Sequence, residues 1–475
     1  MNIPILNGVY TGESADYQTQ YPINMIPVVQ NTGVSDAYLR PVEGIVRLGT
    51  DTGDGVSRGA INWNGVHYRV LGSKLCSITE LGVITVLGDV GTNGERVSMD
   101  YSFDRLAVAS NNSLFYWNGT TFVQVTDVDL GNALDVVWID GYFMTTDGEY
   151  LVVTDIDDPT SITITKYGSS EIDPDPIKAL LKHRNEIYAL NRYTIEIFDN
   201  VGGEVFDFPF QRVNGAQIQR GTMGTHTAVV YEEAIAFIGS GRNEAPGIYM
   251  AANAQSTKIS TREVDEILNT FSESELSLAV METLNDKGHA FLWIRLPDRT
   301  FVYDHTASKS MEEPVWFIMS SSATTSLQTY RGIDAIWCYD SWQVGDTDSG
   351  NIGVLDSTIS SHYGDAVSWE FSTKIIYNNS KGVLFKSLEL VPLTGRIMGF
   401  DDPIISTSYS LDGRTWSQDR IITLDTTSGA GDRLKRIVWW RQGHMKSIRV
   451  QRFRGDSNSY LAVSRLEADI EPLGV

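Results

Sequence analysis

The sequence predicts an all-β protein whose centre is a β-propeller of six or seven blades, with an extended N-terminal arm and a C-terminal β-sandwich-like domain. A tight turn followed by two apolar runs recurs along the chain, beginning at Asn64-Gly65. Asn-Gly is typical of a type I′ hairpin, because both central residues need a positive φ. The run after each turn is often apolar throughout, as expected for a strand covered on both faces.

The spacing of these turns indicates one small antiparallel sheet per repeat. The turns lie at residues 65, 104, 140, 184, 232, 287 and 340, so they are 39, 36, 44, 48, 55 and 53 residues apart. Repeats of roughly 40–50 residues with several short strands are typical of propellers, in which each sheet buries its faces against its neighbours. Unrelated hairpins in a generic all-β protein are the alternative, because the repeat lacks an invariant motif.

Residues 1–55 are predicted to form an extended arm. Segments 21–27 and 38–45 contain proline among apolar residues, and proline restricts both itself and the residue before it. Such an arm lies along a neighbouring subunit or completes the last blade of its own ring. The sequence leaves both possibilities open.

Residues 56–365 carry the repeats, with a short helical insertion near 260–284. Ser260 and Glu263 have the spacing of a capping box in which Ser260 is the N-cap, and Ser272 and Glu275 repeat that relation. One face of the first helix is apolar and is expected to pack on the propeller rather than on a partner. The residues of that face are Val264, Ile267, Leu268 and Phe271.

From about residue 366 the predicted strands become longer, and residues 366–475 are expected to form a separate β-sandwich-like domain. Asp412-Gly413 lies between two short polar and aromatic runs and predicts a hairpin. The expected strands are 367–376, 385–392, 404–411, 420–424, 437–440, 447–453 and 461–466.

The composition is acidic, with a formal net charge of −23. Such a surface repels nucleic acid, which argues against wrapping DNA but not against a protein that DNA slides past. Acidity also keeps a large protein soluble. Cys76 and Cys338 are expected to be buried free thiols, in keeping with a reducing cytosol. No apolar run approaches the roughly 20 residues of a membrane helix, and no secretory leader is expected.

Chemical motifs are sparse, and no catalytic, cofactor-binding or metal-binding residue is predicted. The acidic clusters 155–158, 173–175 and 346–348 are better explained as turn-forming carboxylates than as calcium ligands. Residues 410–416 approach the Asp-box of sialidase-type propellers, but an Asp-Gly hairpin explains them. A carbohydrate-binding or glycan-hydrolysing β-propeller protein is the alternative class, and it requires a pocket near the propeller axis with converging carboxylates and aromatic side chains.

One segment, 433–454, is basic and has no acidic residue. Basic residues with aromatic neighbours can bind nucleic acid, and they can equally meet an acidic protein. Because the remaining chain is acidic, contact with another subunit or partner is the first expectation, DNA contact the second, and a solvated strand face the third. The candidate contact residues are Arg433, Lys435, Arg436, Trp439, Trp440, Arg441, Lys446, Arg449, Arg452 and Arg454.

Short pieces spread along the chain resemble the packaged-DNA stabilisation protein family (tail hub, or tail accessory factor) of short-tailed bacteriophages of the lambdoid Salmonella type. The pieces are 21–25 (YPINM), 38–40 (YLR), 55–59 (GVSRG), 68–70 (YRV), 96–99 (RVSM), 280–284 (VMETL), 296–297 (LP), 302–304 (VYD), Trp316 and 330–334 (YRGID). Their specificity lies in their joint order, which agrees to about residue 335; the C-terminal part matches loosely.

The resemblance implies a structural virion protein with no catalytic residue and no cofactor. It implies a ring, expected to be a hexamer, below the head-to-tail adaptor protein. That ring holds the tail needle and the tailspike or tail fibre, retains packaged DNA, and forms part of the DNA ejection channel without sequence-specific binding. The expected location is the virion tail, after assembly in the host cytoplasm.

Overall fold

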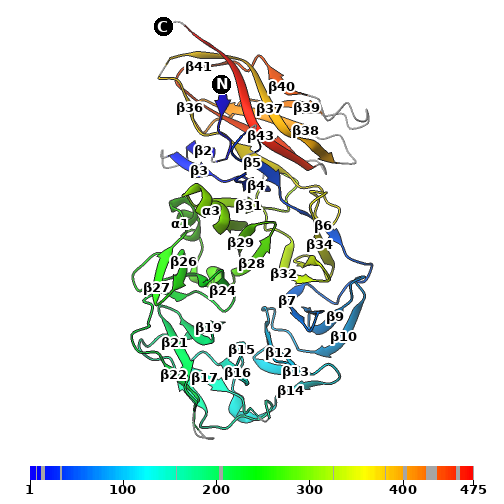
Figure 1. The fold of residues 1–475 in the computed structure, drawn as a ribbon, viewed down its shortest axis with the longest axis vertical. Coiled ribbons are helices and arrows are strands. Elements are labelled where there is room, and N and C mark those ends of the chain that lie inside the picture. Colours follow the sequence, from blue (N-terminus) through cyan, green and yellow to red (C-terminus); the bar gives the residue numbers. More distant parts are fainter. Residues whose placement is uncertain are drawn as a thin grey trace.

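The computed structural model describes residues 1–473 except 7, 12–16, 31, 33–34, 157, 203–206, 325, 380, 399–403, 424–435 and 456–459. Within these residues, seven small antiparallel sheets surround a common axis, and a two-layered β-domain stands at one end of the ring (Figure 1). The predicted all-β class, with a propeller and a C-terminal sandwich, is confirmed, and the described strands form seven blades.

The blades follow one another along the chain. Blade 1 contains β7 (Ser57–Trp63), β8 (Val66–Leu71), β9 (Lys74–Ile78) and β10 (Ile84–Asp89). Blade 2 contains β11 (Ser98–Tyr101), β12 (Leu106–Ser110), β13 (Ser113–Trp117) and β14 (Phe122–Gln124). The short helix η1 (Val128–Leu130) leads to blade 3, which contains β15 (Asp135–Ile139), β16 (Tyr142–Thr146), β17 (Tyr150–Val153) and β18 (Tyr167–Ser169). Blade 4 contains β19 (Ile177–His183), β20 (Glu186–Asn191), β21 (Ile195–Asn200) and β22 (Phe210–Arg212).

The second half of the ring has the same pattern. Blade 5 contains β23 (Gly221–Thr222), β24 (Ala228–Tyr231), β25 (Ala234–Ser240), β26 (Gly247–Ala252) and β27 (Gln255–Lys258). Blade 6 contains β28 (Val280–Asp286), β29 (His289–Arg295), β30 (Thr300–Asp304) and β31 (Val315–Met319). Blade 7 contains β32 (Gly332–Cys338), β33 (Ser341–Asp346), β34 (Ile352–Asp356) and, from the N-terminal arm, β6 (Gly44–Arg47).

The strand β6 closes the ring. It pairs antiparallel with β34, with Ile45 opposite Leu355. Ile45 is fully buried, whereas its neighbour Val46 is 41% exposed. The arm therefore completes the last blade of its own ring, and this pairing satisfies backbone groups that the outer edge of blade 7 would otherwise leave open.

The turn residues adopt the backbone that the repeat requires. Asn64 and Gly65 have φ values of 53° and 77° and join the paired residues Trp63 and Val66. The pair Asp140-Gly141 also has positive φ at both positions. Turns of this kind match the right-handed twist of the two strands they join.

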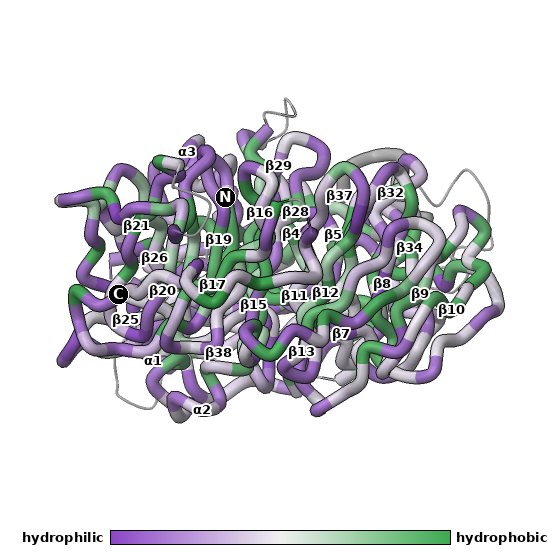
Figure 2. The backbone as a smooth tube through the Cα atoms, turned by 90° about the horizontal axis from the view of Figure 1, so that it is seen from below, coloured by the Kyte–Doolittle hydropathy of each residue, from purple (hydrophilic) through white to green (hydrophobic). Residues whose placement is uncertain are grey.

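Strands in the ring are covered on both faces, as their apolar runs predict. All seven residues of β25 are buried. Phe237 packs in a cluster with Leu190 of blade 4, and the next residue, Ile238, packs in a cluster with Leu292 of blade 6. Apolar stretches lie along strands such as β19 and β17, while many turns are hydrophilic (Figure 2). Burial of each such side chain stabilises the fold by about 1.5–3 kcal/mol.

The helical insertion forms, with one difference in its cap. Helix α1 (Arg262–Leu268) begins after Thr261, whose side chain accepts a hydrogen bond from the Val264 N–H, so Thr261 and not Ser260 is the N-cap. Glu263 does not reach back to Ser260; its carboxylate accepts the Thr19 N–H at 3.1 Å. Helix α2 (Glu273–Leu276) has the expected capping box of Ser272 and Glu275.

The apolar face of α1 packs on the propeller. Val264 and Leu268 are fully buried in a cluster that includes residues of blades 5 and 6, with Ile267 and Phe271 partly buried against it. A third helix, α3 (His305–Met311), was not predicted; Asp304 caps it by accepting the Ala307 N–H.

The two-layered domain is a sandwich of two sheets. The first sheet has the order β4 (Met25–Val28), β5 (Tyr38–Pro41), β43 (Tyr460–Pro472), β37 (Val383–Met398) and β40 (Ile437–Trp440), with β1 (Asn2–Ile3) on β43 and β41 (His444–Met445) on β37. The second has the order β35 (Trp369–Ser372), β42 (Ile448–Gly455), β38 (Ile404–Ser410) and β39 (Arg420–Thr423), with β36 (Ile376–Tyr377) on β42. A separate hairpin is formed by β2 (Gly8–Thr11) and β3 (Tyr17–Gln20).

The N-terminal arm is shared between the propeller and the sandwich. Strands β1, β4 and β5 belong to the first sandwich sheet, and Met25 and Leu39 are fully buried in its core with Phe371 and Phe385. Between β3 and β4, Ile23 makes backbone bridges to β35 of the sandwich and to β31 of blade 6. The sandwich core is therefore incomplete without residues far away in the sequence.

Candidate functional site

The basic segment 433–454 does not form one surface. Arg433 and Lys435 lie outside the described residues. The other candidates are divided between β40 and β41 of the first sheet, with their flanks, and β42 of the second. Their environments range from fully buried to exposed.

Arg449 and Trp439 belong to the sandwich core. The Arg449 guanidinium lies between the rings of Phe385 and Tyr409, 4.3 and 4.0 Å from their centroids. It donates to Gln451 Oε1 and to the Gln442 carbonyl. Burial lowers the pKa of Arg449 to about 10. The buried Trp439 indole donates to the Arg420 carbonyl at 3.0 Å. Neither side chain is available to a partner in this conformation, because each is enclosed by its own chain.

Arg452 and Arg454 lie on β42 and are half-buried. Arg452 stacks on the Trp416 ring, with the guanidinium carbon 3.9 Å from the ring centroid. Its Nη2 donates to Ser408 Oγ at 3.2 Å. Arg454 Nε donates to the Glu370 carboxylate. Only part of each guanidinium therefore faces solvent.

The exposed candidates gather where the edges of the two sheets meet. Strand β40 ends the first sheet and β39 ends the second. Arg420 Nη1 donates to the carbonyls of Trp440 and Arg441 at 3.0 and 2.7 Å, which joins the two edges. We call this surface the basic edge; it consists of Arg420, Ile421, Arg436, Trp440, Arg441 and Lys446.

The basic edge combines cationic and apolar groups. Trp440 and Ile421 are each 64% exposed. Arg436 pairs with Glu389, whereas Arg441 and Lys446 are exposed and have no ion-pair partner among the described residues. Arg420 and Ile421 lie outside the segment that the sequence singled out. Arg420 is the first residue of a predicted strand, but nothing in the sequence places that strand beside Trp440; only the fold does.

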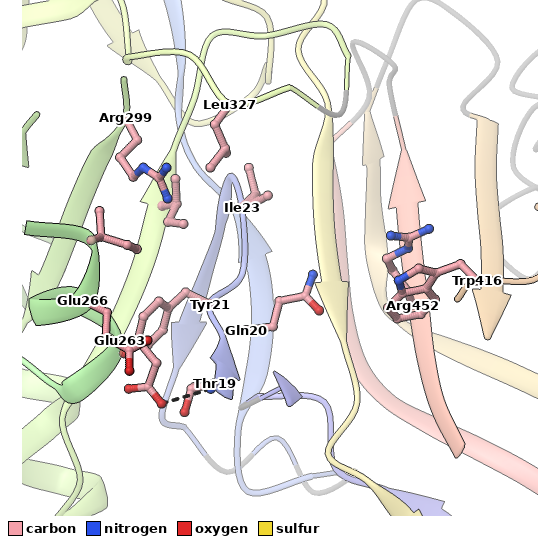
Figure 3. A pocket seen from close by; sticks show the side chains of 12 residues that line it. Thr19, Gln20, Tyr21, Ile23, Glu263, Glu266, Arg299, Leu327, Trp416 and Arg452 are labelled. Atoms are coloured by element: carbon pink, nitrogen blue, oxygen red, sulfur yellow. Dashed lines mark hydrogen bonds between the residues drawn. The ribbon is translucent and has the colours of Figure 1, made fainter. Parts of the chain in front are cut away.

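A cleft lies between the propeller, the arm and the sandwich (Figure 3). Its volume is about 320 Å³. Glu263 and Glu266 of α1 stand on one side, and Trp416 and Arg452 of the sandwich on the other. Tyr21 of the arm lies beside the two glutamates and is anchored by a hydrogen bond to Thr261. The cleft therefore presents acidic, aromatic and basic groups that come from three parts of the chain.

A buried network of charged side chains joins the blades on both sides of the point where the ring closes, between blade 7 and blade 1. Arg69, fully buried in blade 1, donates to the Asp334 carbonyl at 2.9 Å and to Ser57 Oγ at 2.7 Å. Arg96 pairs with the Asp334 carboxylate. Glu282 of blade 6 accepts the Asp334 N–H at 2.8 Å. The network therefore links blades 6, 7 and 1 with the segment that enters blade 2.

The network shifts the protonation of its members. Burial alone would raise the pKa of Asp334, but Arg96 and Arg69 hold that pKa below its usual value. Burial, followed by the neighbouring Asp334, raises the pKa of Glu282. Burial and the charge of Arg96 lower the pKa of His226 to about 3, so this imidazole is neutral at pH 7. The two carboxylates are engaged by donors of the chain itself, unlike a glycosidase pair that acts on substrate.

The other acidic motifs serve local structure. Asp155 pairs with Lys166, and Asp346 with Arg331. Asp412 accepts the N–H groups of Arg414 and Thr415, and hydrogen bonds led by that of the Thr415 hydroxyl lower the pKa of Asp412. No group of three or more potential metal-ligating side chains occurs in the part of the chain that the structure describes.

The two cysteines, Cys76 and Cys338, are both buried free thiols. Burial raises the pKa of the Cys76 thiol to about 11. No helix among the described residues has the length and apolarity needed to cross a membrane.

Comparison with known proteins shows a match along nearly the whole chain. The family model described as "Bacteriophage P22 Gp10, beta-propeller" matches residues 1–360, and "Bacteriophage P22 Gp10, beta-sandwich" matches residues 368–471. The tail hub protein gp10 of Salmonella phage P22 is 26% identical over 489 residues, which cover 99% of each chain.

Solved structures show more distant likenesses. The WD40 domain of Pan2 from Neurospora crassa has a TM-score of 0.42 at 10% identity, over 66% of this chain and 96% of that one. The N-terminal domain of Nup159 has a TM-score of 0.41 at 8% identity, over 66% and 95%. The family predicted from short ordered pieces of sequence is thus confirmed by the two family models: the chain belongs to the bacteriophage P22 Gp10 family.

Proposed function

We propose that this chain is the structural subunit of a phage tail hub, which closes the filled capsid against DNA loss and forms part of the ejection channel. The observation that carries the proposal is the match to the tail hub protein gp10 over 99% of both chains. The fold supports it, because the arm ties the propeller and the sandwich into one block through β6 on one side and β1, β4 and β5 on the other.

We infer that the DNA channel is enclosed by a ring of subunits and does not run through a single propeller. The buried network of Arg69, Arg96, Glu282 and Asp334 connects neighbouring blades by short hydrogen bonds and ion pairs. Widening one propeller enough to admit DNA would break these contacts. The net charge of −23 suits a channel wall, because an acidic wall repels DNA and lets it slide.

The proposed assembly is a ring of six subunits below the head-to-tail adaptor protein, in contact with the tail needle and with a tailspike or tail fibre. The arrangement follows from the family resemblance. The basic edge is the proposed contact with an acidic protein partner, because it presents an exposed tryptophan among cations on an otherwise acidic chain. Buried free thiols at Cys76 and Cys338 agree with assembly in a reducing host cytoplasm.

A phage that lacks this chain tests the function. We expect capsids that fill with DNA but lose it, and tails without needle or spikes. Adding the purified chain to such particles should restore DNA retention. Particles that keep their DNA without the chain would contradict the proposal.

We propose that the chain catalyses no reaction. Glu282 and Asp334 are two neighbouring buried carboxylates, and both are held by groups of the chain itself. We expect no hydrolysis in a screen of host surface glycans with the purified chain. Turnover that Glu282→Gln abolishes would establish the carbohydrate-active alternative.

A further inference from the structure

Two stretches of opposite charge lie near the two ends of the long axis of the chain. Residues 127–175, in and beside blade 3, contain twelve acidic residues and one basic residue, Lys166. Residues 436–454, in the sandwich, contain six basic residues and no acidic one. Blade 3 and the sandwich stand at opposite ends of the molecule (Figure 1). The two regions of opposite charge therefore cannot meet within one chain.

At the acidic end, several carboxylates lie on the side of the propeller where β16 turns into β17. A Cβ on Gly131 would stand 3.8 Å from the Asp147 carboxylate, and one on Gly148 would stand 3.5 Å from Leu134. Tyr150 of β17 pairs with Ser169 of β18, which brings Glu149 and Glu171, just outside these two strands, to the same end of the blade. We call this patch the acidic rim; it consists of Val128, Asp129, Leu134, Asp147, Glu149 and Glu171.

Each patch also exposes apolar surface that a contact would bury. Val128 on the acidic rim is 91% exposed, and Trp440 and Ile421 stand out on the basic edge. Exposed apolar residues framed by charges are typical of protein interaction sites. Each patch thus has an apolar part and an excess of one sign of charge, and the two signs are opposite.

We propose that the basic edge of one copy docks on the acidic rim of a second copy of this chain. This inference rests on the proposed ring assembly and names the surfaces that form it. The contact is heterologous, since two different patches of the same chain meet. Such contacts build a ring when the rotation from one copy to the next closes, and an open filament when it does not. Complementary charges steer the encounter and fix the register, while the apolar residues are buried at its centre.

Reversing the charges on each side tests the proposal. The edge variant is Arg441→Glu with Lys446→Glu, and the rim variant is Asp129→Lys with Glu171→Lys. All four side chains are exposed, and none has a salt bridge among the described residues, so the fold is expected to be kept. The matched control is Glu80→Lys with Glu312→Lys, two exposed residues that form no salt bridge among the described residues; it changes the charge as the rim variant does but lies away from blade 3. Circular dichroism and melting curves verify folding.

The measurement is self-association by sedimentation at low ionic strength. We expect the wild type and the control to associate, and each reversal variant to bind itself at least about a hundredfold more weakly, because like charges then face each other. A mixture of the two variants should recover association, since the unchanged edge meets the unchanged rim and the reversed edge meets the reversed rim, each with opposite charges. The chain that carries all four reversals should recover self-association. High salt should weaken the wild-type contact.

Other outcomes overturn the proposal. A wild-type chain that stays monomeric at the highest concentration measured, or variants that associate as the wild type does, would exclude this contact. Loss in the edge variant alone would assign the edge to a different acidic partner. None of these results would affect the tail hub role, which the DNA-retention experiment tests separately.

Discussion

Ile45 offers a quantitative test of ring closure by the arm. Its side chain fills space beside two glycines of blade 7: Cγ2 is 2.3 Å from where a Cβ on Gly353 of β34 would stand, and Cδ1 is 3.2 Å from that position on Gly332 of β32. The backbone of Ile45 is held by hydrogen bonds to Ser361 and Tyr363 at 2.8 Å. Ile45→Ala removes three carbon atoms from a site whose glycine neighbours have no side chains to fill the space.

The expected cost follows from these contacts. Three buried carbons contribute about 2.4 kcal/mol of transfer free energy. The cavity adds to this, so the opening free energy of blade 7 should fall by about 3–4 kcal/mol. Val46→Ala is the matched control on the same strand; Val46 is 41% exposed, and its loss should cost less than about 0.5 kcal/mol.

Native-state hydrogen exchange of the β34 amides measures this opening directly. In Ile45→Ala these amides should exchange at least about a hundredfold faster than in the wild type. Blade 3, on the other side of the ring, serves as the internal reference. Equal exchange in Ile45→Ala and Val46→Ala would refute closure of the ring by β6.

Three further predictions follow. Leu39 belongs to the arm but is fully buried in the sandwich core, so Leu39→Ala should destabilise the sandwich by about 2–5 kcal/mol. Hydrogen exchange of the β43 amides should become faster; unchanged exchange would show that the arm does not stabilise the sandwich. Asp334→Ala leaves Arg69 buried without its carboxylate and should cost about 3–5 kcal/mol in denaturant unfolding, whereas a cost below about 1 kcal/mol would mean the network is dispensable. Burial and then Arg331 lower the pKa of His362 to about 3, so the unfolded chain takes up its proton first as pH falls below about 6.5. The contribution of neutral His362 to the free energy of unfolding is fully present above that pH, and the free energy of unfolding should fall by about 2 kcal/mol at pH 5. The fall should be smaller in His362→Gln. The same pH dependence in both proteins would show that His362 is not the titrating group.

Local patterns were sufficient to predict most of the propeller. The turns at Asn64-Gly65 and Asp140-Gly141 have the positive φ values that their sequence suggests, and the apolar runs after them are buried on both faces. The capping box of Ser272 and Glu275 also forms, because caps depend on a few adjacent residues. At the first helix the same logic failed by one residue, since the Glu263 carboxylate is drawn to the arm.

Long-range pairing was beyond the reach of sequence patterns. Asn2 pairs with Glu467, and nothing near either residue indicates the other. The basic segment was recognised by charge alone, but charge does not distinguish Arg449, enclosed between two aromatic rings, from the exposed Arg441. Arg420 joins the basic edge only because β39 and β40 lie side by side in the fold.

The most direct test of the tail hub assignment is an electron cryomicroscopy reconstruction of virions in which this chain carries a bound antibody fragment. We expect density for the propeller and the sandwich in a closed ring around the DNA path, between the adaptor and the needle. The assignment would be contradicted if the antibody fragment were found only on the capsid or only on particles without tails. It would also be contradicted by a tail whose ring density lacks the propeller and the sandwich.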